Sequence, residues 1–213
     1  MITPKGQSIE DQSMEIIDNE IGTHPYSPDE WIIVKRIIHS TADFDFAREN
    51  KVIFHNNAIQ SALDALKKGC NIIVDVNGVI GGFNKDNMKK FENQVICNIS
   101  DPMVIEEAKK LNKTRAQTSM RLAAKQMNNG IVAIGNAPTA LLEVIQMINE
   151  GLTSPALVIG IPVGFVCAVE SKDELRNTKI PYITNIGRKG GSPCASAIVN
   201  ALYKILIARS KTV

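Results

Sequence analysis

The clearest pattern in this chain is a repeated pairing of a short apolar run with a glycine and a second, helical pattern. The apolar runs are Ile131–Ile134, Leu157–Ile161 and Tyr182–Ile186. Short runs rich in β-branched residues and bounded by Gly or Pro are typical of buried strands. In a parallel sheet, the turns that follow these strands lie along one edge, which is the edge where open α/β sheets bind ligands.

The rest of the chain also alternates between strand and helix patterns. Ser27, Pro28 and Glu30 form a capping signal that predicts a helix to about His39, and Ser8 is expected to cap a helix that ends at Ile21. The other predicted elements are an edge strand at 51–55, a helix at 57–68, a strand at 71–76, a loop at 78–82, a short helix at 85–91, a strand at 95–99, a helix at 102–111 and a helix from 114 to just before 130.

Helices are expected to follow the three apolar runs, beginning near Pro138, Val163 and Pro193, with Ser192 capping the last. For the second of these helices, the segment Glu170–Glu174 offers an alternative capping box, which would start the helix about eight residues later. The early start is preferred. Repeated strand and helix units predict an α/β fold: one domain over residues 1–213, with a mostly parallel sheet of about five strands and helices on both faces.

The composition of the chain disfavours several classes of function. The chain has 213 residues, is 44% hydrophobic and 22% charged, and carries a formal net charge of +2, which does not favour nucleic-acid binding. The longest apolar run is interrupted by Pro162 and is shorter than the ~20 residues of a membrane span. There is no signal-peptide pattern. We therefore expect a cytoplasmic protein with neither nucleic-acid nor membrane partners.

Metal binding and disulfide bonding are not expected either. The four cysteines are far apart and form no Cys-x-x-Cys pair, which favours free thiols in a reducing compartment. No two histidines have the spacing of helical metal ligands, and no Gly-x-Ser-x-Gly motif suggests a serine hydrolase.

Two segments could bind anions. The loop Gly187–Ser192 combines Arg188 and Lys189 with flexible backbone ahead of a helix, which suits carboxylates or phosphates, but a solvated turn fits equally well. Thr114 and Arg115 at a helix start could also hold an anion or could simply cap the helix. No nucleotide-binding glycine motif is present.

One histidine is placed for proton chemistry. Arg36 and His39 are three residues apart on a predicted helix, so they project from the same side, and an imidazole can exchange protons near neutral pH. The alternative is that His39 pairs locally with Asp43 or Asp45.

Taken together, these segments resemble the precorrin-8 methylmutase family of cobalamin biosynthesis. The matching segments, in the family's order, are 36–39 with Asp43, 114–115, 134–141, 159–166, 170–172, 181–183 and 187–192. The resemblance implies a homodimeric α/β isomerase that moves a methyl group of a corrin precursor from carbon 11 to carbon 12. No cofactor is implied, and any cobalt would be carried by the substrate.

The resemblance also implies roles for individual residues. His39 matches the family's catalytic histidine, which is thought to protonate the macrocycle. The positions expected to contact the substrate, which carries many carboxylates, are Ser13, Arg36, Thr114, Arg115, Asn136, Thr139, Gly164, Arg188, Lys189, Gly190, Gly191 and Ser192.

The chain departs from the family pattern at Gly78, where family members commonly have methionine, so the pocket or the substrate could differ. A non-catalytic corrinoid carrier on the same fold is the main alternative. A flavodoxin-like nucleotide binder is weaker, because the phosphate motifs are missing.

Overall fold

A computed structural model describes residues 3–49 and 51–210 and shows one six-stranded sheet in the order β1-β6-β5-β4-β2-β3. All neighbouring strands are parallel except β1, which pairs antiparallel with β6 at one edge. The strands are β1 (Val52–Phe54), β2 (Asn71–Val74), β3 (Gln94–Ile96), β4 (Ile131–Ile134), β5 (Leu157–Gly160) and β6 (Tyr182–Asn185). The α/β class, the parallel sheet and the edge strand are confirmed.

The sheet is buried because its side chains alternate between two apolar layers. Along β4, Ile131 and Ala133 join one core, whereas Val132 and Ile134 join the other. Each core is closed by helices that turn an apolar stripe toward the strands, so the predicted covering of both faces is confirmed.

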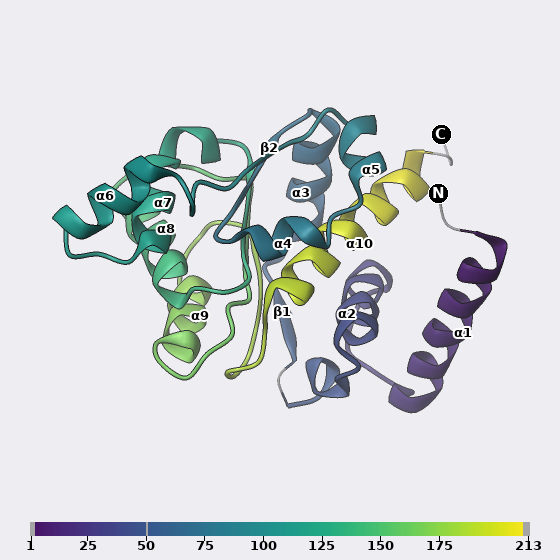
Figure 1. Cartoon of the computed structure of the whole chain (residues 1–213). Helices are drawn as coiled ribbons and strands as arrows, with labels where there is room; N and C mark the ends of the chain where they lie inside the picture. The colour runs from purple at the N-terminus through teal and green to yellow at the C-terminus, as the bar shows by residue number, and fades with distance from the viewer. Residues whose placement is uncertain (1–2, 50, 211–213) are drawn as a thin grey trace.

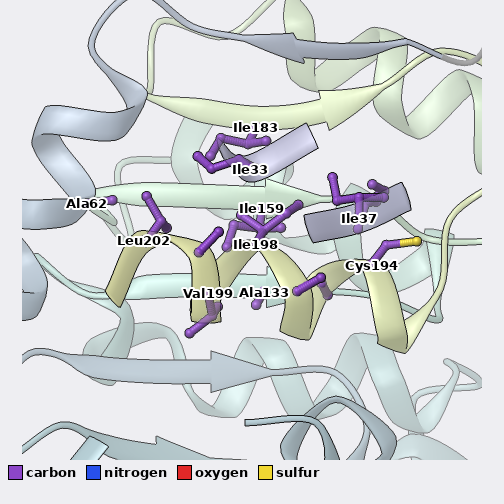
Figure 2. Packing of buried hydrophobic residues seen from close by; sticks show 14 of the residues in the cluster. Ile33, Ile37, Ala62, Ala133, Ile159, Ile183, Cys194, Ile198, Val199 and Leu202 are labelled. Atoms are coloured by element: carbon purple, nitrogen blue, oxygen red, sulfur yellow. The ribbon is translucent and has the colours of Figure 1, made fainter. Parts of the chain in front are cut away.

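On one face, α10 lies against the strands and α2 packs on α10, with α3 and α4 beside them and α1 outermost (Figure 1). Figure 2 shows Ile198 and Leu202 of α10 packed near Ile159 and Ile183 of the sheet. The elements of this half are α1 (Pro4–Ile21), α2 (Pro28–Thr41), the 3₁₀ helix η1 (Phe44–Ala47), α3 (Ala58–Lys67), α4 (Asn77–Gly81), α5 (Lys85–Lys90) and α10 (Ser192–Ser210).

The opposite face is covered by α7, α8 and α9, with α6 packed on α7. The elements of this half are α6 (Pro102–Lys110), α7 (Arg115–Leu122), the 3₁₀ helix η2 (Ala124–Met127), α8 (Pro138–Asn149) and α9 (Ala168–Arg176). The capping boxes predicted at Ser27 and Thr114 are both present.

Three local predictions were wrong. Helix α1 begins at Pro4 and is capped by Thr3, whose Oγ1 accepts from Gly6 N at 3.1 Å, so Ser8 lies inside the helix. The predicted loop at 78–82 is largely occupied by α4 (Asn77–Gly81). The helix from 114 is shorter than expected, because α7 ends at Leu122 and a 3₁₀ turn follows.

The early start of the helix after β5 was also wrong. Helix α9 begins at Ala168, two residues before the alternative capping box at Glu170. Gly164 has φ +156° and Cys167 has φ +60°, and neither conformation belongs to a right-handed helix. Residues 162–167 therefore form a loop at the end of the sheet, where Phe165 is 87% exposed and Val166 is 79% exposed.

Candidate active site

The first part of the site is a hollow of about 340 Å³ between α2, α4 and α10. Arg36 and His39 line it, one turn apart on α2 as their spacing predicts. Gly78 and Gly82 of the α4 segment line the opposite side. A Cβ at position 82 would lie 2.3 Å from Ser196 Oγ, so the close approach of this segment to α10 requires glycine there. At position 78 a Cβ would lie 3.1 Å from Ser192 Oγ.

His39 also borders a second hollow, of about 320 Å³, which Ser13 and Ile16 of α1 line from the other side. His39 therefore stands between two hollows and shares one with Arg36 and the other with Ser13. Its side chain is exposed, and no described residue forms a hydrogen bond with the imidazole. The imidazole is thus free to face a ligand.

The aspartates that the sequence offered as partners for His39 bind a different residue. Lys189 Nζ lies 2.7 Å from Asp43 Oδ2 and 2.6 Å from Asp45 Oδ2. Hydrogen bonds to these carboxylates raise the pKa of Lys189 above its ordinary value. This contact joins the loop after β6 to the segment after α2, so the structure brings Lys189 and the His39 region together.

Arg36 is also paired. Its Nη1 lies 2.7 Å from Glu10 Oε1 on α1, and Lys204 Nζ of α10 is 3.6 Å from the same oxygen. Because Glu10 is the only acid bonded to Arg36 among the residues that the structure describes, the Arg36 guanidinium can bind a ligand carboxylate by exchanging this one partner.

The loop after β6 meets the loop after β5 at the edge of the sheet. The Gly164 N–H donates to Arg188 O at 3.2 Å, and the Arg188 guanidinium lies 5.7 Å from the centre of the Phe165 ring. Gly190 has φ +158°, and a Cβ there would lie 2.3 Å from Ile161 O, so the backbones of the two loops approach each other at this position and leave no room for a side chain. Gly191 donates to Ile161 O at 3.0 Å, and Ser192 is the first residue of α10.

The loop after β4 does not present its backbone to a ligand, which the sequence did not reveal. The buried Asp75 carboxylate accepts from the N–H groups of Gly135, Asn136 and Ala137 at 3.0, 2.8 and 2.7 Å. Burial raises the pKa of Asp75, although these three hydrogen bonds act in the opposite direction. Because Asp75 occupies these amides, only the exposed side chain of Asn136 remains for binding.

Thr114 and Thr139 come together, with their Oγ1 atoms 3.1 Å apart, where α7 and α8 begin. Thr114 also caps α7, and the neighbouring Arg115 is exposed with no ion pair to any described residue. This group joins the other loops through Gly135, whose Cβ, if present, would lie 2.9 Å from Ser192 Cα. The predicted positions thus fall at one edge of the sheet, with Ser13, Arg36 and His39 beside it.

Lys172 lies in the matching segment 170–172 but was not predicted to be a site residue, and the structure buries it. Its side chain, 1% exposed, projects from α9 beneath the loop after β6 and donates to Gly187 O at 2.9 Å and to Lys189 O at 2.6 Å. Burial lowers the pKa of Lys172 to about 8. Its spacing from the buried residues Ala168 and Leu175, four before and three after it, would have placed it on the covered face of the helix.

No cluster of three metal-binding side chains occurs within residues 3–49 and 51–210. Across the same residues, no helix combines the length and the apolar character that crossing a bilayer requires.

Comparisons with known proteins give one family. The family model described as precorrin-8X methylmutase matches residues 8–205. A cobalt-precorrin-8 methylmutase of Priestia megaterium is 49% identical over 201 residues, covering 94% of this chain and 88% of that protein. One from Leptospira interrogans is 47% identical, covering 94% of each. A crystal structure of precorrin-8X methylmutase from Thermus thermophilus superposes with a TM-score of 0.89 at 37% identity, covering 96% of this chain and 98% of that one.

Replacement of Asp75 tests how firmly it joins β2 to the start of α8. We expect Asp75→Asn to lower the free energy of unfolding by about 2–3 kcal/mol, because the amide group cannot accept all three N–H groups. Urea denaturation measures this loss. Asp64→Asn, on the exposed face of α3, is the control and should change stability by less than about 0.5 kcal/mol. If the two variants lower the free energy of unfolding equally, the three hydrogen bonds to Asp75 do not stabilise the fold as expected.

The buried Lys172 predicts a specific pH dependence. Its pKa is about 8 in the folded chain against 10.5 for an ordinary lysine, so the cost of burying the charge is present below pH 8 and disappears as the pH rises to 10.5. Over that window we expect the unfolding free energy of the native chain, minus that of Lys172→Met, to rise by about 3 kcal/mol.

The difference between the two proteins is needed for this measurement, because burial raises the pKa of Cys70 to about 11 and that of Tyr26 to about 12, and both groups titrate near the same range. Urea denaturation of both proteins at several pH values supplies the difference. If the difference in unfolding free energy stays constant from pH 8 to 10.5, burial does not lower the pKa of Lys172.

Proposed function

Because the chain belongs to the precorrin-8X methylmutase family, we propose that it is an isomerase of cobalamin biosynthesis that moves a methyl group of a precorrin-8 macrocycle from carbon 11 to carbon 12. The family match over residues 8–205 carries this proposal, since it spans both the sheet and the hollows beside His39. The migration is intramolecular, so it requires neither a methyl donor nor a redox cofactor.

We propose cobalt-precorrin-8 as the substrate and cobyrinic acid as the product. The support is that the relatives from Priestia megaterium and Leptospira interrogans both carry the name cobalt-precorrin-8 methylmutase. The cobalt ion enters and leaves with the macrocycle. Cobalt-free precorrin-8, which would give hydrogenobyrinic acid, is the alternative substrate. Gly78, where the chain departs from the family pattern, lines the hollow beside His39.

His39 is proposed as the general acid. The support is its place between two hollows, with an exposed imidazole to which no described residue bonds. A proton delivered to the macrocycle as the methyl group migrates stabilises charge that develops only in the transition state, so the acid increases kcat rather than tightening binding.

The substrate's carboxylates are proposed to bind around this acid. Arg115 and Arg188 are exposed and have no carboxylate partner among the described residues, whereas Arg36 and Lys189 would exchange their present acidic partners for substrate. The remaining proposed contacts are Ser13, Thr114, Asn136, Thr139, Gly164, Gly190, Gly191 and Ser192.

A homodimer is proposed for two reasons: in one chain the hollows beside His39 are small, and α1 exposes an apolar face. The two hollows beside His39 lie at the small end of the ~300–1,000 Å³ range of ligand pockets. On α1, Ile9 and Ile16 lie on the same face as Ser13, and each is 55% exposed. A second copy covering this face would bury the two isoleucines and deepen the hollow that Ser13 and His39 share.

A cytoplasmic location is proposed on the chemistry of the thiols. All four cysteines are free, and burial raises the pKa of the Cys70 thiol to about 11 and that of Cys194 to about 12, so these groups stay protonated in the fold.

The role of His39 is tested by following the absorbance spectrum of cobalt-precorrin-8 mixed with the protein. The native chain should convert it to cobyrinic acid, and His39→Ala should lower kcat by about 10²–10⁴-fold with a small change in KM. His55→Ala, in a turn after β1, is the matched control and should keep the native rate. If the native chain perturbs the spectrum without converting the substrate, it is a corrinoid-binding protein. If His39→Ala retains full kcat, His39 is not the acid.

The homodimer is tested by analytical ultracentrifugation. The native chain should sediment at about twice its 23.3 kDa mass, and Ile9→Glu combined with Ile16→Glu should sediment as one chain, because burying two carboxylates is unfavourable. Met103→Glu, an exposed apolar position on α6 that is 71% exposed, is the control and should remain dimeric. A native monomer, or a dimer unaffected by the double variant, would contradict the proposed interface.

A further inference from the structure

The loop after β6 has an unusual backbone arrangement, because the four carbonyl oxygens of residues 186–189 all bind donors of the protein. Asn185 Nδ2 donates to Ile186 O at 2.9 Å and to Lys189 O at 3.0 Å. Lys172 Nζ donates to Gly187 O at 2.9 Å and to Lys189 O at 2.6 Å. The Gly164 N–H donates to Arg188 O at 3.2 Å.

Peptide geometry then fixes the direction of the N–H groups. In a trans peptide the C=O and N–H bonds point in opposite directions, and none of the described peptides is cis. The N–H groups of Gly187, Arg188 and Gly190 are therefore turned away from Lys172 and Asn185, and the N–H of Lys189 is turned away from Gly164. None of them donates to another described residue, and the next N–H, that of Gly191, donates to Ile161 O just after β5. Consecutive outward N–H groups form an anion-binding concavity.

Among the described residues, the side chains of Lys172 and Asn185 donate hydrogen bonds only to carbonyl groups of this loop. Both side chains are buried, at 1% and 0% exposure, and the only hydrogen-bond acceptors of Lys172 Nζ among the described residues are the two loop carbonyls. A buried ammonium without a bonded carboxylate costs folding free energy. Asn185 likewise carries a cost, because its Oδ1 is buried without a hydrogen-bond partner. A buried polar group that carries such a cost calls for an explanation, and a functional role is one.

We propose that Lys172 and Asn185 are positioning residues that hold the loop at 187–190 with its N–H groups outward, as a cradle for one carboxylate of the substrate. This inference rests on the proposed function, in which the same loop binds the macrocycle. Neither residue touches the substrate. Lys172 acts through the carbonyls of Gly187 and Lys189, and its positive charge lies behind the cradle, where it adds to the attraction for an anion.

The test compares two corrinoids with Lys172→Met and a control variant. Cobyrinic acid carries free carboxylates, whereas cobinamide carries neutral amides in most of those positions. For Lys172→Met we expect the Kd of cobyrinic acid to rise about tenfold or more and the Kd of cobinamide to stay within about twofold of the native value. In turnover of cobalt-precorrin-8, KM should rise while kcat changes little, because the cradle binds ground state and transition state alike.

Leu175→Ala is the matched control. Leu175 is buried on the same face of α9 but packs into the core and does not bond the loop, so this variant loosens the helix without releasing the carbonyls. It should keep the native Kd for both corrinoids. Asn185→Leu, which removes the second donor, supplies an independent test should Lys172→Met fail to fold, and it should weaken cobyrinic acid binding in the same selective way.

Three outcomes would overturn the inference. One is native affinity for cobyrinic acid in both Lys172→Met and Asn185→Leu. Another is an equal loss in Leu175→Ala, and the third is a loss for cobinamide as large as that for cobyrinic acid. Failure of the proposed function looks different, because the native chain itself would then neither convert cobalt-precorrin-8 nor bind cobyrinic acid.

Discussion

Helix α10 packs against the sheet with one side and against α2 with the other, and the positions of Arg36 and of His39, the proposed general acid, depend on this double contact. Its apolar residues surround most of the helix, as expected for an element buried between two layers. Ile33 and Ile37 of α2 are buried in the same cluster as Ile198 of α10 (Figure 2). Because Arg36 and His39 are on α2, their position relative to the sheet edge depends on the packing of α2 against α10.

The sequence predicted the parts of the fold that depend on local signals. Apolar runs ending at glycine identified β4, β5 and β6, and the capping boxes at Ser27 and Thr114 identified the starts of two helices. The start of α9 was mistaken because apolar residues continue through Val163–Val166, which the helix was expected to bury, whereas the structure exposes them beyond the sheet. Hydrophobicity alone does not separate a buried helix from an exposed apolar loop.

The candidate site was predictable only in part, for a different reason. The position of His39 follows from helical spacing and from family resemblance, but the partners of the charged groups come from distant parts of the chain. Asp75 binds the loop after β4, and Asp43 and Asp45 bind Lys189 across more than 140 residues of sequence. The pattern of residues within one segment cannot predict contacts between segments so far apart. Several of the predicted anion-binding groups therefore already hold a carboxylate of the protein, which a substrate carboxylate must displace or avoid.

The antiparallel pairing of β1 with β6 has a consequence for synthesis of the chain. Val52 pairs with Asn185, and α2 packs on α10, so the N-terminal elements find their places only after the C-terminal ones have emerged from the ribosome. Contacts this distant in sequence slow folding, because a long loop must close before they form. Until α10 has been synthesised, the face of α2 that packs on it is uncovered. The nascent protein thus passes through a stage in which this face of the helix that carries Arg36 and His39 is exposed, and exposed apolar surface favours aggregation.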